Sequence, residues 1–416
     1  MPDTAQNPAP GFHMLGIAPQ ILQILQCHKI VVPTPIQHQS IPPAIEGKDI
    51  VGIAQTGTGK TFAFGIPLLQ RLAQKPGRGL IIVPTRELAI QVDESLQIFA
   101  QSLGIRTAVI IGGAPMRQQR EMIRRNPRVV IATPGRLNDH LQQRTITLKE
   151  VNILVLDEAD RMLDMGFRPQ IEAFFRLVAP VRQTLLFSAT MPPEIMKLAH
   201  THMKLPLRIE VAPSGTTVKG IEQELFIVQK LEKLQLLETL LKEHRGSILV
   251  FSRTKHGAKK ITRSLKAKGH AVAEIHANRT LNQRREALQG FKTGRYRILI
   301  ATDIAARGID VTGIEVVINF DLPDDPSDYV HRIGRTARAG HSGRAISFAT
   351  ADQRNQVRDI ERLVRLSLRR KNTPVFPGQP IPPSESRPFQ TPPASRGDKW
   401  HSIKQFRPGQ RYSGKR

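Results

Sequence analysis

Lys60 and Thr61 close the segment Ala54-Gln55-Thr56-Gly57-Thr58-Gly59-Lys60-Thr61, the stretch of the chain best suited to chemistry. The apolar run 50–53 before it predicts a buried strand, and apolar residues at helical spacing over 62–72 predict a helix after it. Glycines accept positive φ at no steric cost, so this loop can turn its backbone amides inward around a polyphosphate. We expect Lys60 to reach the β- and γ-phosphates and the Thr61 hydroxyl to ligate Mg²⁺. A plain glycine turn is the alternative, because Ala54 stands where the first glycine is usual.

An acidic pair, Asp157 and Glu158, follows the apolar run 151–156, which predicts a core strand. A carboxylate at the end of such a strand can hold Mg²⁺, the role expected of Asp157. Glu158 is expected to orient and polarise the attacking water, because transfer of a γ-phosphoryl group requires an in-line nucleophile. Acidic residues after a strand more often form a solvated turn. In one chain with Lys60, however, they favour a nucleoside triphosphatase.

Two further segments are placed to sense the nucleotide. The predicted strand 184–187 ends at Ser188-Ala189-Thr190, and these hydroxyls are expected to bond Asp157 or Asp160 and to relay the nucleotide state. Gln37 follows two prolines, which fix the backbone as a rigid turn or helix start. Its amide both donates and accepts, as recognition of an adenine edge requires.

Polar and glycine-rich loops follow three more predicted strands, 79–83, 107–111 and 129–132. The carboxyl ends of parallel strands share one edge of a sheet, where ligands bind. Backbone amides, Thr hydroxyls and Arg side chains suit a phosphodiester backbone and carry no base readout. Ordinary turns would explain any one loop, but three together favour a nucleic-acid path. Its expected members are Pro84, Thr85, Arg86, Gly113, Thr133, Pro134, Gly135 and Arg136.

The chain has 416 residues and a formal net charge of +26, which favours a polyanionic partner. An anionic membrane surface is the competing explanation, but the sequence contains no run of about 18 apolar residues. Residues 1–10 lack the apolar core of a signal peptide, and the single cysteine, Cys27, excludes an internal disulfide. These features predict a cytoplasmic protein with no membrane association.

Alternating strand and helix patterns predict an α/β protein made of two tandem domains, each a parallel sheet flanked by helices. We expect a disordered N-terminus over 1–11, a first domain over 12–207, a linker over 208–219 and a second domain over 220–368. A short helix is expected within 12–30. Residues 369–416 hold 11 Lys and Arg against two acidic residues and few large aliphatic residues. They predict a disordered basic tail that tethers RNA or only solubilises the chain.

The motifs together resemble those of DEAD-box ATP-dependent RNA helicases with RecA-like domains, and the short extensions resemble the bacterial RhlE-type branch. The resemblance covers roughly 12–368. It rests on the phosphate loop, the Q motif Pro33-Thr34-Pro35-Ile36-Gln37 with Phe12 upstream, PTREL at 84–88, TPGR at 133–136, DEAD at 157–160 and SAT at 188–190.

The resemblance assigns further residues in the second domain. It implies that Arg335 and Arg338 act as arginine fingers on the γ-phosphate, that His331 couples the sites, and that Gly308 and Asp310 contact the nucleotide, Asp310 at its ribose. It also implies that Arg253, Thr302 and Asp303 lie at or near the RNA path. Lys29-Ile30, Ala277, Leu281 and Ala337 depart from the usual family residues.

The implied activity is RNA-stimulated ATP hydrolysis with local, non-processive unwinding of short RNA duplexes or remodelling of RNA–protein complexes. An ATP-gated RNA clamp and a DNA translocase with the same two domains are the alternatives. ATP and Mg²⁺ are the implied cofactors, and RNA of little sequence preference is the implied partner. Ribosomal-precursor or RNA-decay assemblies are further expected partners of a monomeric protein.

Overall fold

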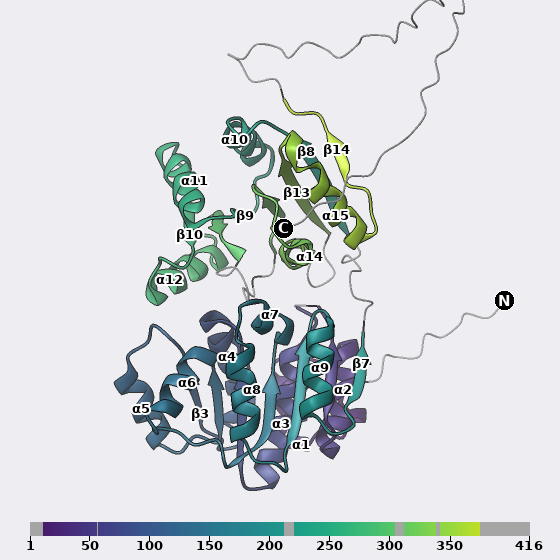
Figure 1. Cartoon of the computed structure of the whole chain (residues 1–416), viewed down its shortest axis with the longest axis vertical. Helices are drawn as coiled ribbons and strands as arrows, with labels where there is room; N and C mark the ends of the chain where they lie inside the picture. Colours follow the sequence, from purple (N-terminus) through teal and green to yellow (C-terminus); the bar gives the residue numbers. More distant parts are fainter. Residues whose placement is uncertain are drawn as a thin grey trace, which may run out of the picture. The chain divides into compact units, whose positions relative to one another are not determined.

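Two parallel sheets organise the computed structural model, which describes residues 11–55, 57–211, 220–303, 311, 313–337 and 342–374. In these residues each sheet has seven strands, and every paired strand runs parallel to its neighbour (Figure 1). The two-domain α/β fold predicted from the alternating pattern is therefore confirmed. The described residues of both sheets belong to one compact unit.

The first sheet has the strand order β3-β4-β2-β5-β6-β1-β7. The strands are β1 (Ile50–Ile53), β2 (Arg78–Ile82), β3 (Thr107–Ile110), β4 (Val129–Ala132), β5 (Val151–Leu156), β6 (Gln183–Ser188) and β7 (Leu207–Glu210). The helices are η1 (Phe12–Leu15), α1 (Pro19–Cys27), α2 (Pro35–Glu46), α3 (Lys60–Gln74), α4 (Arg86–Ala100), α5 (Met116–Arg124), α6 (Pro134–Gln142), α7 (Ala159–Asp164), α8 (Arg168–Leu177) and α9 (Pro193–His202).

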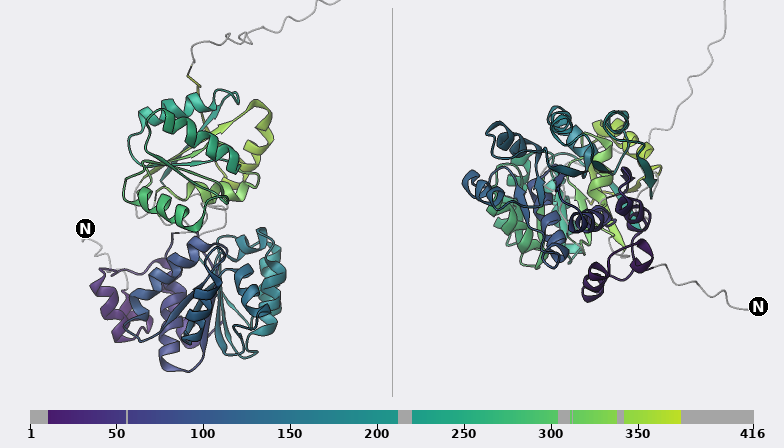
Figure 2. Two further views of the ribbon diagram at one scale, coloured as in Figure 1. Left: turned by 90° about the vertical axis from the view of Figure 1, so that its left-hand side faces the viewer. Right: turned by 90° about the horizontal axis from the view of Figure 1, so that it is seen from below.

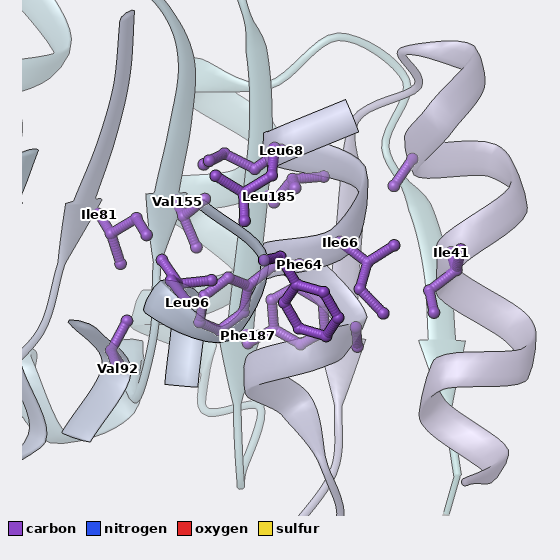
Figure 3. Packing of buried hydrophobic residues seen from close by; sticks show 14 of the residues in the cluster. Ile41, Phe64, Ile66, Leu68, Ile81, Val92, Leu96, Val155, Leu185 and Phe187 are labelled. Carbon is purple, nitrogen blue, oxygen red and sulfur yellow. The ribbon is translucent and has the colours of Figure 1, made fainter. Parts of the chain in front are cut away.

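Alternate residues of each central strand enter two separate apolar clusters, because successive side chains of a strand point to opposite faces. Ile81, Val155 and Leu185 pack with residues of α2, α3 and α4 on one face (Figure 3). Leu80, Leu154 and Leu186 pack with residues of α6, α8 and α9 on the other. Burial on both faces explains why these strands are continuous apolar runs in the sequence.

The second sheet has the order β10-β11-β9-β12-β13-β8-β14. Its strands are β8 (Ile221–Ile227), β9 (Ile248–Phe251), β10 (Val272–Ile275), β11 (Ile298–Ala301), β12 (Val316–Asn319), β13 (Gly343–Ala349) and β14 (Arg369–Lys371). Its helices are α10 (Lys233–Glu243), α11 (Lys255–Ala267), α12 (Leu281–Lys292), α14 (Pro326–Ile333), η2 (Ala351–Gln353) and α15 (Arg354–Val364). Figure 2 shows helices on both sides of each sheet.

Three expectations about local structure need correction. The single helix expected within 12–30 is two elements, η1 and α1, separated where Gly16 adopts φ 73°. The expected linker begins too early, because residues 208–210 continue β7, which pairs with β1. The expected tail likewise begins too early, because residues 369–371 form β14 beside β8. There Lys371 pairs with Glu224 at 3.1 Å. Residues 208–210 and 369–371 become part of the sheets because they pair with strands that lie far away in the sequence.

Candidate active site and nucleic-acid interface

The loop between β1 and α3 has the backbone that a phosphate cradle needs. Gly57 and Gly59 have φ values of 84° and 88°, the left-handed region that favours glycine. Gly59 is the N-cap of α3, so the helix N-terminus with its partial positive charge faces the loop. A Cβ on Gly59 would lie 2.4 Å from Nε2 of Gln37, so the close approach also requires glycine there.

Lys60 is the residue that most clearly indicates an anionic ligand. Its side chain is buried, and in the part of the chain that the structure describes its Nζ has no hydrogen-bond partner. A buried ammonium without a partner is costly, which indicates that this one is built to meet a ligand. Lys60 lines a pocket of about 350 Å³ together with Thr61, Asp157 and Glu158.

The two carboxylates after β5 differ in ionisation. Burial raises the pKa of Asp157 to about 6, although the charge of Lys60 opposes this shift. Burial also disfavours ionisation of Glu158, but Arg161, Lys60 and Arg335 outweigh it and hold the pKa at about 2. Nη1 of Arg161 donates to Oε2 of Glu158 at 2.8 Å, and both side chains are buried. Sequence reasoning missed Arg161, although its spacing of three from Glu158 on a helix start was the available signal.

Asp160 connects the acidic segment to the end of β6. Its Oδ2 accepts from the backbone N–H of Ala189 at 3.1 Å and from both N and Oγ1 of Thr190 at 2.8 Å. Oγ of Ser188 accepts from the Asp160 N–H at 3.3 Å. Of the two residues expected to bond these hydroxyls, Asp160 is the partner of both, through its carboxylate for Thr190 and through its backbone N–H for Ser188. The Asp157 carboxylate instead accepts from the Glu158 N–H at 2.9 Å.

Gln37 lies beside the loop with its amide already engaged. Its Nε2 donates to the Gly59 carbonyl at 3.0 Å, and its Oε1 accepts from the Thr34 N–H at 2.9 Å. Ile30 and Val32 line the same pocket as Gln37, whereas Phe12 is buried in the core and does not line it. Because η1 packs this ring inward, the expected contact of Phe12 with the nucleotide stays a prediction.

The loops after β2, β3 and β4 meet at one edge of the first sheet, as the sequence predicted. They line a hollow of about 530 Å³. Gly113 has φ 78°, and a Cβ there would lie 2.3 Å from Nη1 of Arg86. Nη1 of Arg136 donates to the Ala114 carbonyl at 3.0 Å, which ties two of the loops together. The lining residues expected from the sequence are Pro84, Thr85, Arg86, Gly113, Thr133, Gly135 and Arg136; Pro134 begins α6 and is buried.

Helix α12 of the second sheet contributes to this hollow. Arg284 of this helix lines it, as does Ala277 in the loop between β10 and α12. Nη1 of Arg284 lies 3.0 Å from Oε1 of Glu87, with both side chains buried. Sequence reasoning missed this ion pair, because nothing in the spacing of two residues almost two hundred positions apart indicates it.

The other second-sheet residues expected at the RNA path do not line this hollow. Asp303 forms a bidentate pair with Arg332, at 2.5 Å to Nε and 2.7 Å to Nη2. Its carboxylate therefore holds Arg332 of α14, and the expected place of Asp303 at or near the RNA path stays a prediction. Thr302 donates its N–H to the Ile275 carbonyl at 3.3 Å. Arg253 lies 3.3 Å from Asp324 and lines a different hollow, of about 610 Å³.

Arg335 is buried and lines the same pocket as Lys60, Asp157 and Glu158. Its Nε donates to the His331 carbonyl at 3.2 Å, within the same turn of chain. His331 lies near Arg161 and Asp160, and burial lowers its pKa to about 3, with Arg161 adding to the effect. Thr56, Gly308, Asp310 and Arg338 lie outside the described residues, so their expected roles stay predictions.

The pocket fits a nucleoside triphosphate with its metal ion. Lys60 and the Gly57–Gly59 backbone suit phosphates, and a buried carboxylate beside a threonine hydroxyl suits Mg²⁺, which prefers oxygen ligands. No helix among the described residues is long and apolar enough to cross a membrane. One parallel sheet with a phosphate loop, followed by a second whose described residues contain none, is typical of triphosphatases with two tandem RecA-like domains.

Comparisons with known proteins give the family. The DEAD/DEAH box helicase model matches residues 34–198, and the helicase conserved C-terminal domain model matches residues 231–340. The chain is 42% identical over 368 residues to the DEAD-box ATP-dependent RNA helicase CshA of Bacillus cereus, covering 88% of this chain and 70% of that one. It is also 42% identical over 351 residues to the ATP-dependent rRNA helicase RRP3 of Debaryomyces hansenii, covering 83% and 74%.

The solved structure of S. cerevisiae Dbp5 bound to RNA and ADP BeF3 is similar with a TM-score of 0.81 and 30% identity, covering 88% of this chain and 96% of that one. The chain belongs to the DEAD-box ATP-dependent RNA helicase family. It binds ATP and RNA, and it is an RNA-dependent ATPase that unwinds or remodels RNA.

Proposed function

We propose that ATP is hydrolysed in the pocket between the phosphate loop and the acidic pair, and that RNA lies across the hollow lined by Arg86, Gly113 and Arg136. The buried Lys60 ammonium, which has no hydrogen-bond partner among the described residues, carries the proposal. It would hold the β- and γ-phosphates, while Thr61 and Asp157 would hold Mg²⁺. The ion would neutralise developing charge on the phosphates.

Glu158 would position the attacking water and polarise it. A carboxylate whose pKa stays near 2 remains ionised at any physiological pH, so it accepts a hydrogen bond from water without first having to lose a proton. Its pairing with Arg161 fixes the side chain in one orientation. Arg335 would act as an arginine finger, together with Arg338, and its place in the Lys60 pocket supports this role.

His331 and Asp160 would couple nucleotide state to RNA binding, since Asp160 holds the Ser188–Thr190 turn and lies near His331. RNA would be bound mainly through its backbone, so sequence preference would be small. Contacts to 2′-hydroxyls would distinguish RNA from DNA. Unwinding would be local and non-processive, ending when hydrolysis releases the strand.

We further propose the finer assignments that the sequence suggested. The short extensions support the RhlE-type branch, although the curated relatives include proteins named CshA. The rRNA helicases among the relatives support ribosomal-precursor assemblies as partners, alongside RNA-decay assemblies. The protein would act as a monomer in the cytoplasm, where ATP and RNA are both available.

Replacing Glu158 with Gln tests the catalytic proposal. The variant is expected to bind ATP and RNA with wild-type affinity and to lose RNA-stimulated phosphate release by about 10²- to 10⁴-fold. Glu121→Gln, at an exposed site on α5, is the matched control and should turn over normally. Undiminished phosphate release by Glu158→Gln would refute the proposed role. Duplex release measured in parallel separates an unwinder from an ATP-gated clamp.

A further inference from the structure

Helix α11 has an unusual distribution of charge. Residues 255–268 contain six Lys and Arg and no Asp or Glu. Lys255, Lys259, Arg263 and Lys266 are exposed and spaced by four, four and three, so they form one stripe along the helix. The opposite face, including Ile261 and Leu265, is buried against the sheet. Figure 1 shows α11 beside β10 at an outer side of the second sheet.

This stripe is unfavourable for the isolated helix. Like charges four residues apart repel each other, and cations in the first turn oppose the helix dipole. Among the described residues the side chains of Lys259, Arg263 and Lys266 make no hydrogen bond or ion pair. Helix α15 shows the ordinary alternative, because its arginines alternate with Asp359 and Glu361 and Arg362 pairs with Asp359 at 3.2 Å. A surface that only keeps the protein soluble can therefore mix both signs of charge, as α15 does, and does not require the all-positive stripe of α11.

The stripe begins where an RNA contact is expected. Lys255 lies two residues after Arg253, and Lys260 of the same helix lines the hollow of about 610 Å³ with Arg253 and Lys230. From Lys255 to Lys266 the helix rises about 16 Å at about 1.5 Å per residue. That length is enough for the stripe to contact several successive phosphates of one strand.

We propose that the α11 stripe, defined as Lys255, Lys259, Arg263 and Lys266, is a second RNA-binding surface that holds the phosphate backbone of RNA extending beyond the proposed path. It recognises charge and not sequence, because lysine and arginine on a convex helix reach phosphates without entering a groove. The α11 stripe would keep long or structured RNA bound while the strand in the hollow lined by Arg86, Gly113 and Arg136 is released. The inference rests on the RNA path proposed above.

The triple variant Lys259→Gln/Arg263→Gln/Lys266→Gln tests it, leaving Lys255 in place because its Nζ bonds Asn278. Binding to a long RNA, a duplex with a single-stranded overhang, should weaken about tenfold or more at low salt, and the slope of log K against log salt should decrease by about 2. Binding of an oligonucleotide of about six nucleotides should not change. Thermal stability should stay equal or rise, because repulsion is relieved.

The matched control removes three cations from α15, as Arg354→Gln/Arg358→Gln/Arg362→Gln, and should leave both RNA affinities within about twofold. Equal losses in the two variants would overturn the proposal, because net charge alone would explain them. An unchanged affinity of the α11 variant for long RNA would also overturn the proposal. If the α11 variant bound RNA normally but lost binding to polyglutamate, the stripe would instead be a surface for an acidic protein, and the proposal would be overturned. If the wild type did not bind the short oligonucleotide, the RNA path proposed across Arg86, Gly113 and Arg136 would be refuted instead.

Discussion

Arg161 Nη1 lies 2.8 Å from Glu158 Oε2, and each side chain is buried within the first domain. The pair joins the N-cap of α7 to its first turn, and it holds a charged carboxylate beside the pocket proposed to bind the phosphates. Glu158 itself has φ 53°, a strained value for a residue with a side chain. The Arg161 contact helps to explain why that conformation persists, since it compensates the buried charge.

Replacing Arg161 with Met should destabilise the protein by about 3–5 kcal/mol, because it leaves the Glu158 carboxylate buried and uncompensated. The same change should raise the pKa of Glu158, so ATPase activity should begin to fall at a higher pH than in the wild type when the solution is acidified. Chemical denaturation and a pH–rate profile are the measurements. Arg161→Met/Glu158→Gln should recover most of the stability but no activity, and a double variant as unstable as Arg161→Met would contradict this account.

The Glu87–Arg284 ion pair should couple RNA binding to ATP hydrolysis, since both residues line the proposed RNA hollow from different domains. We expect Glu87→Gln and Arg284→Gln each to reduce RNA stimulation of ATPase activity while leaving ATP affinity unchanged. The double variant should be little worse than either single one, giving a coupling energy of about 1–3 kcal/mol. Strictly additive effects would show that the two side chains act independently.

Acid should destabilise the protein partly through His331. Its folded-state pKa of about 3 lies below the ordinary value of 6.5, so the unfolded chain binds the proton more tightly. The stability contributed by the neutral ring is complete above about pH 6.5 and is lost as the pH falls toward 3. Between pH 7 and 5, urea denaturation of His331→Asn should show about 1–2 kcal/mol less loss than the wild type. His13→Asn, in the exposed part of η1, is the control, and equal pH dependence of all three proteins would exclude this role for His331.

Gly113→Ala should weaken RNA binding by displacing Arg86. The added methyl would lie 2.3 Å from Nη1 of Arg86, and φ 78° is strained for alanine. We expect RNA affinity to fall by about tenfold with ATP affinity unchanged, as measured by RNA titration and nucleotide binding. Gly166→Ala also has a positive φ but no atom within 4 Å of its new Cβ. That variant separates backbone strain from displacement of Arg86, and equal effects would show that Arg86 is not involved.

Local patterns were enough to predict the chemistry of the first domain. The phosphate loop, the acidic pair after β5 and the loops after β2, β3 and β4 are each contiguous segments whose conformation depends on nearby residues. Glycines with positive φ and apolar runs before each loop carry that information in the sequence. For the same reason the two parallel sheets follow from the alternation of strands and helices.

Only the tertiary structure decided which segments meet. The Ser188–Thr190 turn follows β6, which lies between β5 and β1, and its partner is Asp160 and not Asp157. Asp303 pairs with Arg332, Phe12 packs into the core, and Arg284 reaches Glu87. Strand order and helix packing bring together residues far apart in the chain, and such long-range pairings leave no periodic trace in a single sequence. The sequence thus determined what each segment can do, and the packing of the sheets and helices decided which residues act together.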